Sequence, residues 1–215
     1  MKIGFFVTQV ACAAGFENTV SAHVQLPLYL MKLLMNAGHT VHLITNEFSQ
    51  NSTFPNCLPE GAKVMVVSDG RRRGKGFVME VGYRKGVYPV KFLKQLFEIR
   101  RIIRDGQYDV FHFFGSSRMA YLAGMMKGMG IKTPLALTIN CGKVPEFFWF
   151  AKKYLWKQLD LVITSTEFFG NQCAAQGIRA EVIKHGIVRP IVVAQEDRLL
   201  SSPRRVLFWR DPSVE

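Results

Sequence analysis

Apolar and polar residues alternate along the chain in blocks that predict short strands separated by helices. The strand candidates are rich in β-formers, and several are apolar without interruption, which is typical of parallel strands covered on both faces. They lie at Lys2–Val7, Thr40–Thr45, Ala62–Val67, Asp109–Phe114, Leu135–Ile139, Asp160–Ser165 and Glu181–Lys184.

Helical patterns fill the intervals between these strands. The first helix should stop at Gly38, and Pro27 inside it should kink it or shorten its regular part. The second starts at Pro89, a favourable first helical residue, and we expect it to turn four apolar residues inward: Leu93, Leu96, Phe97 and Ile103. The predicted helices cover about residues 19–37, 89–105, a stretch after 117, 146–157 and 167–176.

Strand–helix alternation of this kind predicts an α/β fold with a doubly wound parallel, Rossmann-like sheet. Ligands of such sheets bind at the carboxyl ends of the strands near the switch point, so four loops matter most. They are Thr8–Asn18, Gly115–Ser117, Asn140–Pro145 and Ser165–Thr166. We expect a first domain over residues 1–193, a polar linker over 194–204, and the truncated start of a second domain over 205–215.

The composition fits a folded protein with reduced thiols. Of the 215 residues, 48% are hydrophobic and 12% aromatic, which is enough for a sizeable core. Cys12, Cys57, Cys141 and Cys173 form no C-x-x-C pair and no metal-ligand spacing. No apolar run is long enough to span a bilayer, and polar Thr8 interrupts the first one too early for a secretory signal. We therefore expect a cytoplasmic protein.

The net charge of +12 is concentrated in one segment. Residues 70–104 hold eleven Lys or Arg and two acids, and an aromatic, lysine-rich helix is predicted at 146–157. These features favour a peripheral site on the anionic inner face of a membrane. The alternatives are a solvated loop and a core helix; nucleic-acid binding is disfavoured because aromatics do not interleave with the basic loop. The predicted surface residues are Arg71, Arg72, Arg73, Lys75, Arg84, Lys85, Trp149, Lys152, Lys153 and Trp156.

The loop Gly15-Phe16-Glu17-Asn18 follows the first strand and precedes the first helix. A glycine there lets the backbone approach a ligand, and the start of a helix favours an anion such as phosphate. An ordinary turn is the alternative. The chain has no G-x-G-x-x-G, so a dinucleotide fingerprint is absent.

Read in order, the motifs resemble those of family 4 glycosyltransferases, retaining enzymes of the GT-B fold. The resemblance covers nearly the whole chain and implies its N-terminal, acceptor-side half. Three positions depart from the family pattern, because Phe114, Asn140 and His185 stand where many members have His, His and Asn. The matching segments are the glycine loop, Ala37–Thr45, Tyr108–His112, Pro134–Thr138, Leu159–Ser165, Val182–Ile187 and Arg205–Arg210.

The resemblance implies transfer of a sugar from a nucleotide-sugar donor to a glycan or lipid-linked acceptor, with no metal or other cofactor. Because the aromatics are not interleaved with the basic loop, we expect no nucleic-acid partner. The resemblance places most donor contacts in a second domain, so this chain alone should be inactive. The alternative is a non-catalytic carbohydrate- or nucleotide-binding module of the same fold. Gly15, Phe16 and Glu17 would contact the donor diphosphate, and His112 would be catalytic or, equally, a core residue. The acceptor cleft would be lined by Ser116, Ser117, Arg118, Asn140, Thr166 and Glu167, for which a helix cap or loop role is the alternative.

Overall fold

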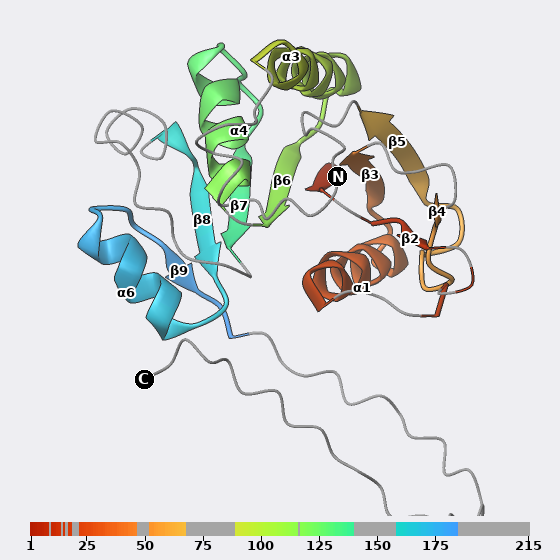
Figure 1. Cartoon of the computed structure of the whole chain (residues 1–215). Coiled ribbons are helices and arrows are strands. Elements are labelled where there is room, and N and C mark those ends of the chain that lie inside the picture. Colours follow the sequence, from red (N-terminus) through yellow and green to blue (C-terminus); the bar gives the residue numbers. More distant parts are fainter. Residues whose placement is uncertain are drawn as a thin grey trace, which may run out of the picture. The chain divides into compact units, whose positions relative to one another are not determined.

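The computed structural model describes residues 1–8, 10–13, 15, 17–18, 22–46, 52–67, 89–115, 117–139 and 158–184. Within these residues, strands form a parallel sheet in the order β5-β3-β1-β6-β7-β8-β9 (Figure 1). A separate antiparallel pair joins β2 (Cys12–Ala13) to β4 (Ser52–Thr53). The strands of the large sheet are β1 (Lys2–Val7), β3 (Thr40–Asn46), β5 (Lys63–Val67), β6 (Val110–Gly115), β7 (Leu135–Ile139), β8 (Leu161–Thr164) and β9 (Glu181–Val182).

The central strands are buried on both faces, which is why their sequences are continuously apolar. In β1 every residue from Ile3 to Val7 is buried, and all of β7 is buried. The register pairs Ile3 with Val41 on one side and with Val110 on the other. The predicted parallel α/β sheet is therefore confirmed, with strand bounds within two residues of the expected ones.

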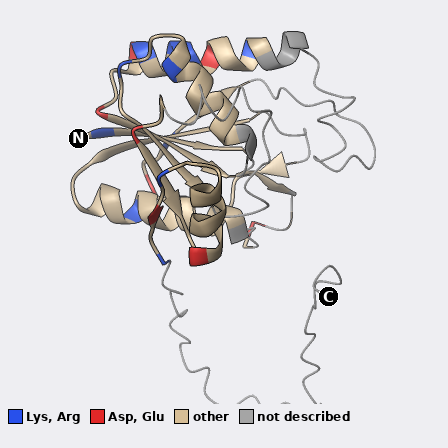
Figure 2. Ribbon diagram, turned by 90° about the vertical axis from the view of Figure 1, so that its left-hand side faces the viewer, with Lys and Arg blue, Asp and Glu red and all other residues tan. Residues whose placement is uncertain are grey.

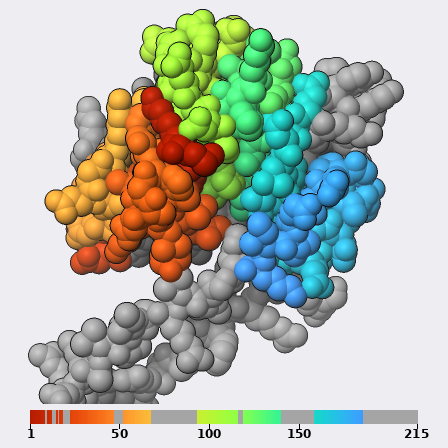
Figure 3. Space-filling view, turned by 180° about the vertical axis from the view of Figure 1, so that it is seen from behind, coloured from red at the N-terminus to blue at the C-terminus, as the bar shows by residue number. Residues whose placement is uncertain are grey.

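Helices cover both faces of the sheet. On one face α1 (Ala22–Asn36) packs against Phe5 and Leu43, while Phe6 and Phe113 pack on the opposite face. Among the described residues, the helices on that opposite face are α3 (Pro89–Gly106), α4 (Ser117–Gly128) and α6 (Glu167–Ala175). Seen from behind, α3 and α4 lie side by side in green above the orange α1 (Figure 3).

The helix ends largely follow the predicted signals. Gly38 and Gly177 follow α1 and α6 with φ of +83° and +70°, the left-handed conformation that glycine adopts without strain. Pro27 is buried inside α1, which the structure describes from Ala22 onward. A loop was expected over Thr8–Asn18, but β2 interrupts it by pairing with β4.

One prediction about α3 is wrong. Leu96 and Ile103 face the core as expected, but Leu93 and Phe97 are 44% and 56% exposed. Ile99 completes the buried stripe instead, because positions 96, 99 and 103 recur at helical spacing and leave 93 and 97 on the outer side.

Several predictions fall outside the described residues. They include the helix at 146–157, the basic residues of the loop at 71–85, and the domain border at residue 193 with its linker. The chain divides into a unit over Met1–Lys184 and a second unit over His185–Glu215, and every described residue belongs to the first.

Candidate functional site

The sheet has its switch point between β1 and β6. After β1 the chain moves outward to β3 and β5, and it then returns to place β6 on the other side of β1 (Figure 1). Helix α1 follows β1 on one face, whereas α4 follows β6 on the other. Connections that leave adjacent strands in opposite directions open a crevice at their carboxyl ends, where ligands of such sheets bind.

The glycine loop follows β2 in the connection between β1 and α1, and it lies beside Asn56, which follows β4. Gly15 is exposed with φ of +86°, a conformation that disfavours other residues. Its backbone N–H donates to Oε1 of Glu17 over 2.8 Å. This hydrogen bond holds the pKa of the Glu17 carboxyl below its ordinary value, so Glu17 is an anion at neutral pH. Phe16 is outside the described residues.

Contacts from distant parts of the chain hold this loop. The Thr45 hydroxyl at the end of β3 accepts the N–H of Val10 over 3.4 Å. Asn56 donates its N–H to the carbonyl of Glu17 over 2.9 Å, and its side-chain amide donates to Oδ1 of Asn18 over 3.0 Å. Asn56 was not predicted as a site residue, because these contacts join positions some 38 residues apart and leave no local pattern.

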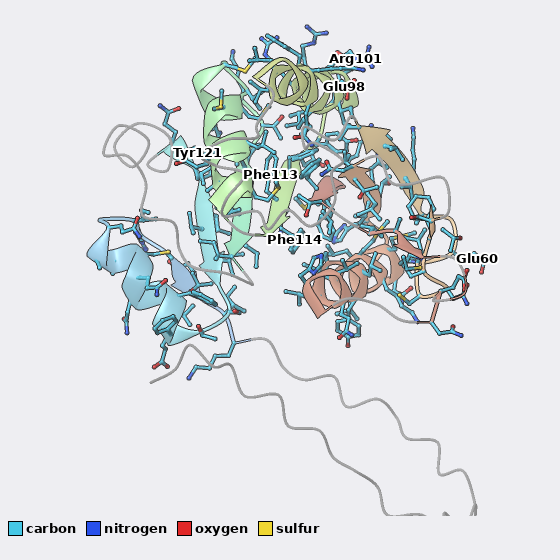
Figure 4. All side chains as sticks on the ribbon, in the orientation of Figure 1. Glu60, Glu98, Arg101, Phe113, Phe114 and Tyr121 are labelled. Atoms are coloured by element: carbon cyan, nitrogen blue, oxygen red, sulfur yellow. The ribbon has the colours of Figure 1, made fainter. Side chains whose placement is uncertain are left out.

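On the other side of the switch point, β6 ends at a glycine that cannot readily be replaced. Gly115 has φ of +142°, and a Cβ there would lie 3.0 Å from Cγ of Met119. The preceding Phe114 is 2% exposed and sits at the end of β6 (Figure 4). The structure describes neither Ser116 nor the side chains of Ser117 and Arg118, so their predicted contacts remain predictions.

His112 lies within the sheet, two residues before Phe114. Its Nε2 shares a hydrogen bond of 2.7 Å with Oγ1 of Thr138, and its ring stacks on Phe114 with centroids 4.0 Å apart. Phe5 contacts it edge-on. The side chain is 8% exposed, and burial lowers the pKa of His112 to about 3, so the imidazole is neutral. These are the surroundings of a satisfied core histidine, and a catalytic role stays a prediction.

At the end of β8, Thr166 has the cap role that the sequence offered as its alternative. Its hydroxyl accepts the N–H of Phe169 over 3.3 Å at the start of α6. Glu167, in the first turn, forms an exposed ion pair of 2.8 Å with Lys184. Lys184 was not singled out by the sequence, although it belongs to the motif after β9. Asn140 lies outside the described residues.

The described residues contain neither a cluster of metal-ligating side chains nor a helix that could span a membrane. No group of three or more His, Cys, Asp or Glu in that part of the chain is arranged to hold a metal ion. None of its helices combines the length and the apolar character needed to cross a bilayer. The aromatic and basic residues predicted to form a membrane surface, at 71–85 and 149–156, lie outside the described residues. Of the cysteines, Cys173 is buried, Cys12 partly buried and Cys57 exposed, and all three are free.

Comparisons with known proteins point in one direction. The family model described as "Glycosyl transferase 4-like domain" matches residues 26–184. A glycosyltransferase from Rickettsia africae aligns with a TM-score of 0.54 at 16% identity, over 86% of this chain and 43% of its own. The lipopolysaccharide outer core galactosyltransferase WaaB aligns with a TM-score of 0.52 at 12% identity, over 85% and 44%. A search of curated protein sequences finds no significant match. The chain spans a little under half the length of both structures, and these likenesses show a shared fold.

Proposed function

Because this chain belongs to the family of glycosyl transferase 4-like domains, we propose that it is the acceptor-side half of a retaining glycosyltransferase with a nucleotide-sugar donor. The observation that carries the proposal is the glycine in the connection between β1 and α1, which leaves the carboxyl end of β1 beside the switch point. Gly15 exposes backbone without a side chain in this connection, and α/β sheets bind their ligands at the carboxyl ends of strands near the switch point.

The proposed chemistry of this half is electrostatic. Departure of a nucleoside diphosphate concentrates negative charge, which preorganised N–H donors stabilise without rearranging. The Gly15 N–H is such a donor, and the Glu17 carboxylate accepts its hydrogen bond at 2.8 Å. The diphosphate would replace that carboxylate on the Gly15 N–H, and Glu17 would turn away or bind a sugar hydroxyl.

The acceptor would lie across the carboxyl edge, between the loops after β6, β7 and β8. We propose a glycan or lipid-linked acceptor, and cytoplasmic action at the inner face of a membrane. Ser116, Ser117, Arg118 and Asn140 follow β6 and β7, and Glu167 with Lys184 offers charged groups at the β8 and β9 end. No metal enters the proposed chemistry.

One observation favours a second candidate, a non-catalytic carbohydrate- or nucleotide-binding module. Phe114 occupies the position where many family members have a histidine near the reacting sugar, and it is buried against His112. The described end of β6 therefore offers an apolar ring at that position, and His112 lies behind it.

Calorimetric titration of the chain with UDP-, GDP- and ADP-sugars tests the proposal. We expect millimolar or weaker affinity, at most about 4 kcal/mol, because the proposal assigns most donor contacts to a second domain. A protein that also carries this domain should bind the donor with a micromolar dissociation constant and transfer sugar. Micromolar binding or transfer by residues 1–215 alone would contradict the two-domain proposal. Donor binding without transfer by the longer protein would favour the module.

A further inference from the structure

The outer side of α3 combines apolar and basic side chains in one stripe. Its members are Leu93, Phe97, Arg101 and Arg104, spaced four, four and three residues apart, so they share one face of the helix. Leu93 and Phe97 are 44% and 56% exposed, and Arg101 and Arg104 are exposed as well. We call these four residues the outer face of α3. Figure 4 shows Arg101 projecting from α3 away from the sheet.

The fold does not need this face. Leu96, Ile99 and Ile103 on the opposite side of α3 are at most 2% exposed and join the core beneath α3 and α4. Single exposed apolar residues are ordinary on protein surfaces. Two large ones a turn apart, in line with two arginines, form the pattern of a helix that lies on an interface.

The charged residues of α3 indicate which kind of partner its outer face would bind. Lys and Arg are concentrated on α3 in Figure 2, whereas α1 on the other face of the sheet is almost free of them. The acids of α3 flank the outer face, where Glu98 pairs with Lys94 at 3.9 Å and Asp105 with Arg104 at 2.9 Å. Such a surface attracts an anionic partner.

We propose that the outer face of α3 docks on an anionic lipid bilayer. Leu93 and Phe97 insert at the boundary between headgroups and acyl chains, and Arg101 and Arg104 bind headgroup phosphates from the same side of the helix. Leu93 favours lipid over nucleic acid, because an aliphatic side chain offers neither a charge to phosphate nor a stacking surface to a base. This binding surface is separate from the proposed sugar-transfer site.

Vesicle cosedimentation with matched double variants tests the proposal. Phe97→Ser with Arg101→Gln removes one apolar residue and one cation from α3. The control, Leu33→Ser with Lys32→Gln, also removes one apolar residue and one cation, but from exposed positions of α1 on the other face of the sheet. Vesicles of phosphatidylcholine, with and without one third phosphatidylglycerol, are compared at about 0.1 M salt. Circular dichroism and melting confirm that each variant is folded.

The parent chain should bind anionic vesicles and lose binding as salt is raised, because screening weakens the arginine contacts. The α3 variant should bind about fiftyfold more weakly, from roughly fivefold for the charge and roughly tenfold for the half-exposed ring. The α1 variant should stay within about twofold of the parent.

Three results would overturn the proposal. The first is α3-variant binding within twofold of the parent, and the second is equal parent binding to neutral and anionic vesicles. The third is binding of the parent to a DNA duplex more tightly than to anionic vesicles, with the DNA binding weakened by Arg101→Gln alone but not by Phe97→Ser alone. That result would assign the outer face of α3 to nucleic acid. Titration with nucleotide sugars tests the sugar-transfer proposal independently, because neither double variant changes a residue of the glycine loop.

Discussion

Asp160 and Leu135 exchange two hydrogen bonds at the amino edge of the sheet. The Asp160 carboxylate accepts the Leu135 N–H over 2.7 Å, and the Asp160 N–H donates to the Leu135 carbonyl over 3.2 Å. Asp109 repeats the arrangement with Lys2, at 2.7 and 2.9 Å. Each aspartate precedes its own strand and satisfies the first N–H of the neighbouring strand. Both belong to motifs of the family resemblance, and both lie at the edge opposite the carboxyl ends of the strands.

Replacing Asp160 with Ala should destabilise the fold by about 2–3 kcal/mol. The change leaves the Leu135 N–H without its acceptor and removes the partner of Lys127, whose ammonium lies 2.7 Å away and is largely buried. Thermal melting should show a decrease of roughly 4–10 °C. Exposed Glu60→Ala is the control and should change little. An unchanged melting temperature for Asp160→Ala would show that the motif aspartate has another role.

Replacing Gly4 with Ala should cost about 3 kcal/mol or more. A Cβ at Gly4 would overlap the ring of buried Phe111, which packs directly beside it. Adding Phe111→Leu should make the double variant less destabilised than the sum of the single changes. Gly38→Ala, where no atom lies within 4 Å and only the φ of +83° is strained, should cost about 1 kcal/mol. Chemical denaturation gives the free energy of unfolding of Gly4→Ala, Phe111→Leu, the double variant and Gly38→Ala.

Replacing His112 with Ala separates a core residue from a catalytic one. In its observed surroundings, the loss of the ring and of the Thr138 hydrogen bond should destabilise the protein by about 2–4 kcal/mol. Activity per folded molecule of the longer enzyme should then stay near normal. A decrease of roughly a hundredfold in turnover with little change in melting would instead assign His112 to the reacting centre.

His112 should also make stability depend on pH in a defined window. Its folded pKa of about 3 lies below the unfolded value of about 6.5, so only the unfolded chain binds this proton between those values. Stability is therefore complete above pH 6.5 and falls as the pH decreases toward 3. Between pH 7 and 5 the loss should be about 2 kcal/mol. In His112→Asn, the free energy of unfolding measured by urea denaturation should depend less on pH over this range than in the parent. An equal pH dependence in the two proteins would contradict the buried neutral state.

Replacing Glu17 with Gln tests the proposed diphosphate site in the longer enzyme. Removing the carboxylate that binds the Gly15 N–H should relieve repulsion of the phosphates and tighten UDP binding by about fivefold. Gly15→Ala, which strains the loop, should weaken it. Titration of both variants at low salt gives the answer. A Glu17→Gln variant that binds UDP no better than the parent would place the diphosphate elsewhere.

Most of the fold was predictable because its strands are buried on both faces. Continuous apolar runs located β1 and β7 to the residue, and glycine signals located the ends of α1 and α6. The inward side of α3 was partly misjudged, since apolar Leu93 and Phe97 fit the helical period but lie off the contact stripe. Two-residue β2 and β4 carry too little pattern to predict, and their pairing is non-local.

The sequence predicts which loops carry the candidate site, and the role of that site stays a prediction. Gly15 and Glu17 could be named from the sequence because the connection after the first strand carries them. Asn56 and Thr45 could not, because they hold the loop through contacts between distant segments. For His112 the sequence left two alternatives, and the position of Thr138 on the neighbouring strand explains the core surroundings.

The place of β1 in the sheet has a consequence for synthesis of the protein. The first strand made is also an inner strand of the sheet, and its register joins Ile3 to Val110 (Figure 1). At a translation rate of about 5–20 residues per second, the partner strand β6 leaves the ribosome roughly 5–20 s after β1 does. During that time an apolar strand with an unpaired edge must be shielded from other chains. Nascent chains halted before residue 115 should therefore be protease-sensitive and bind chaperones, and protection should appear only once β6 has emerged.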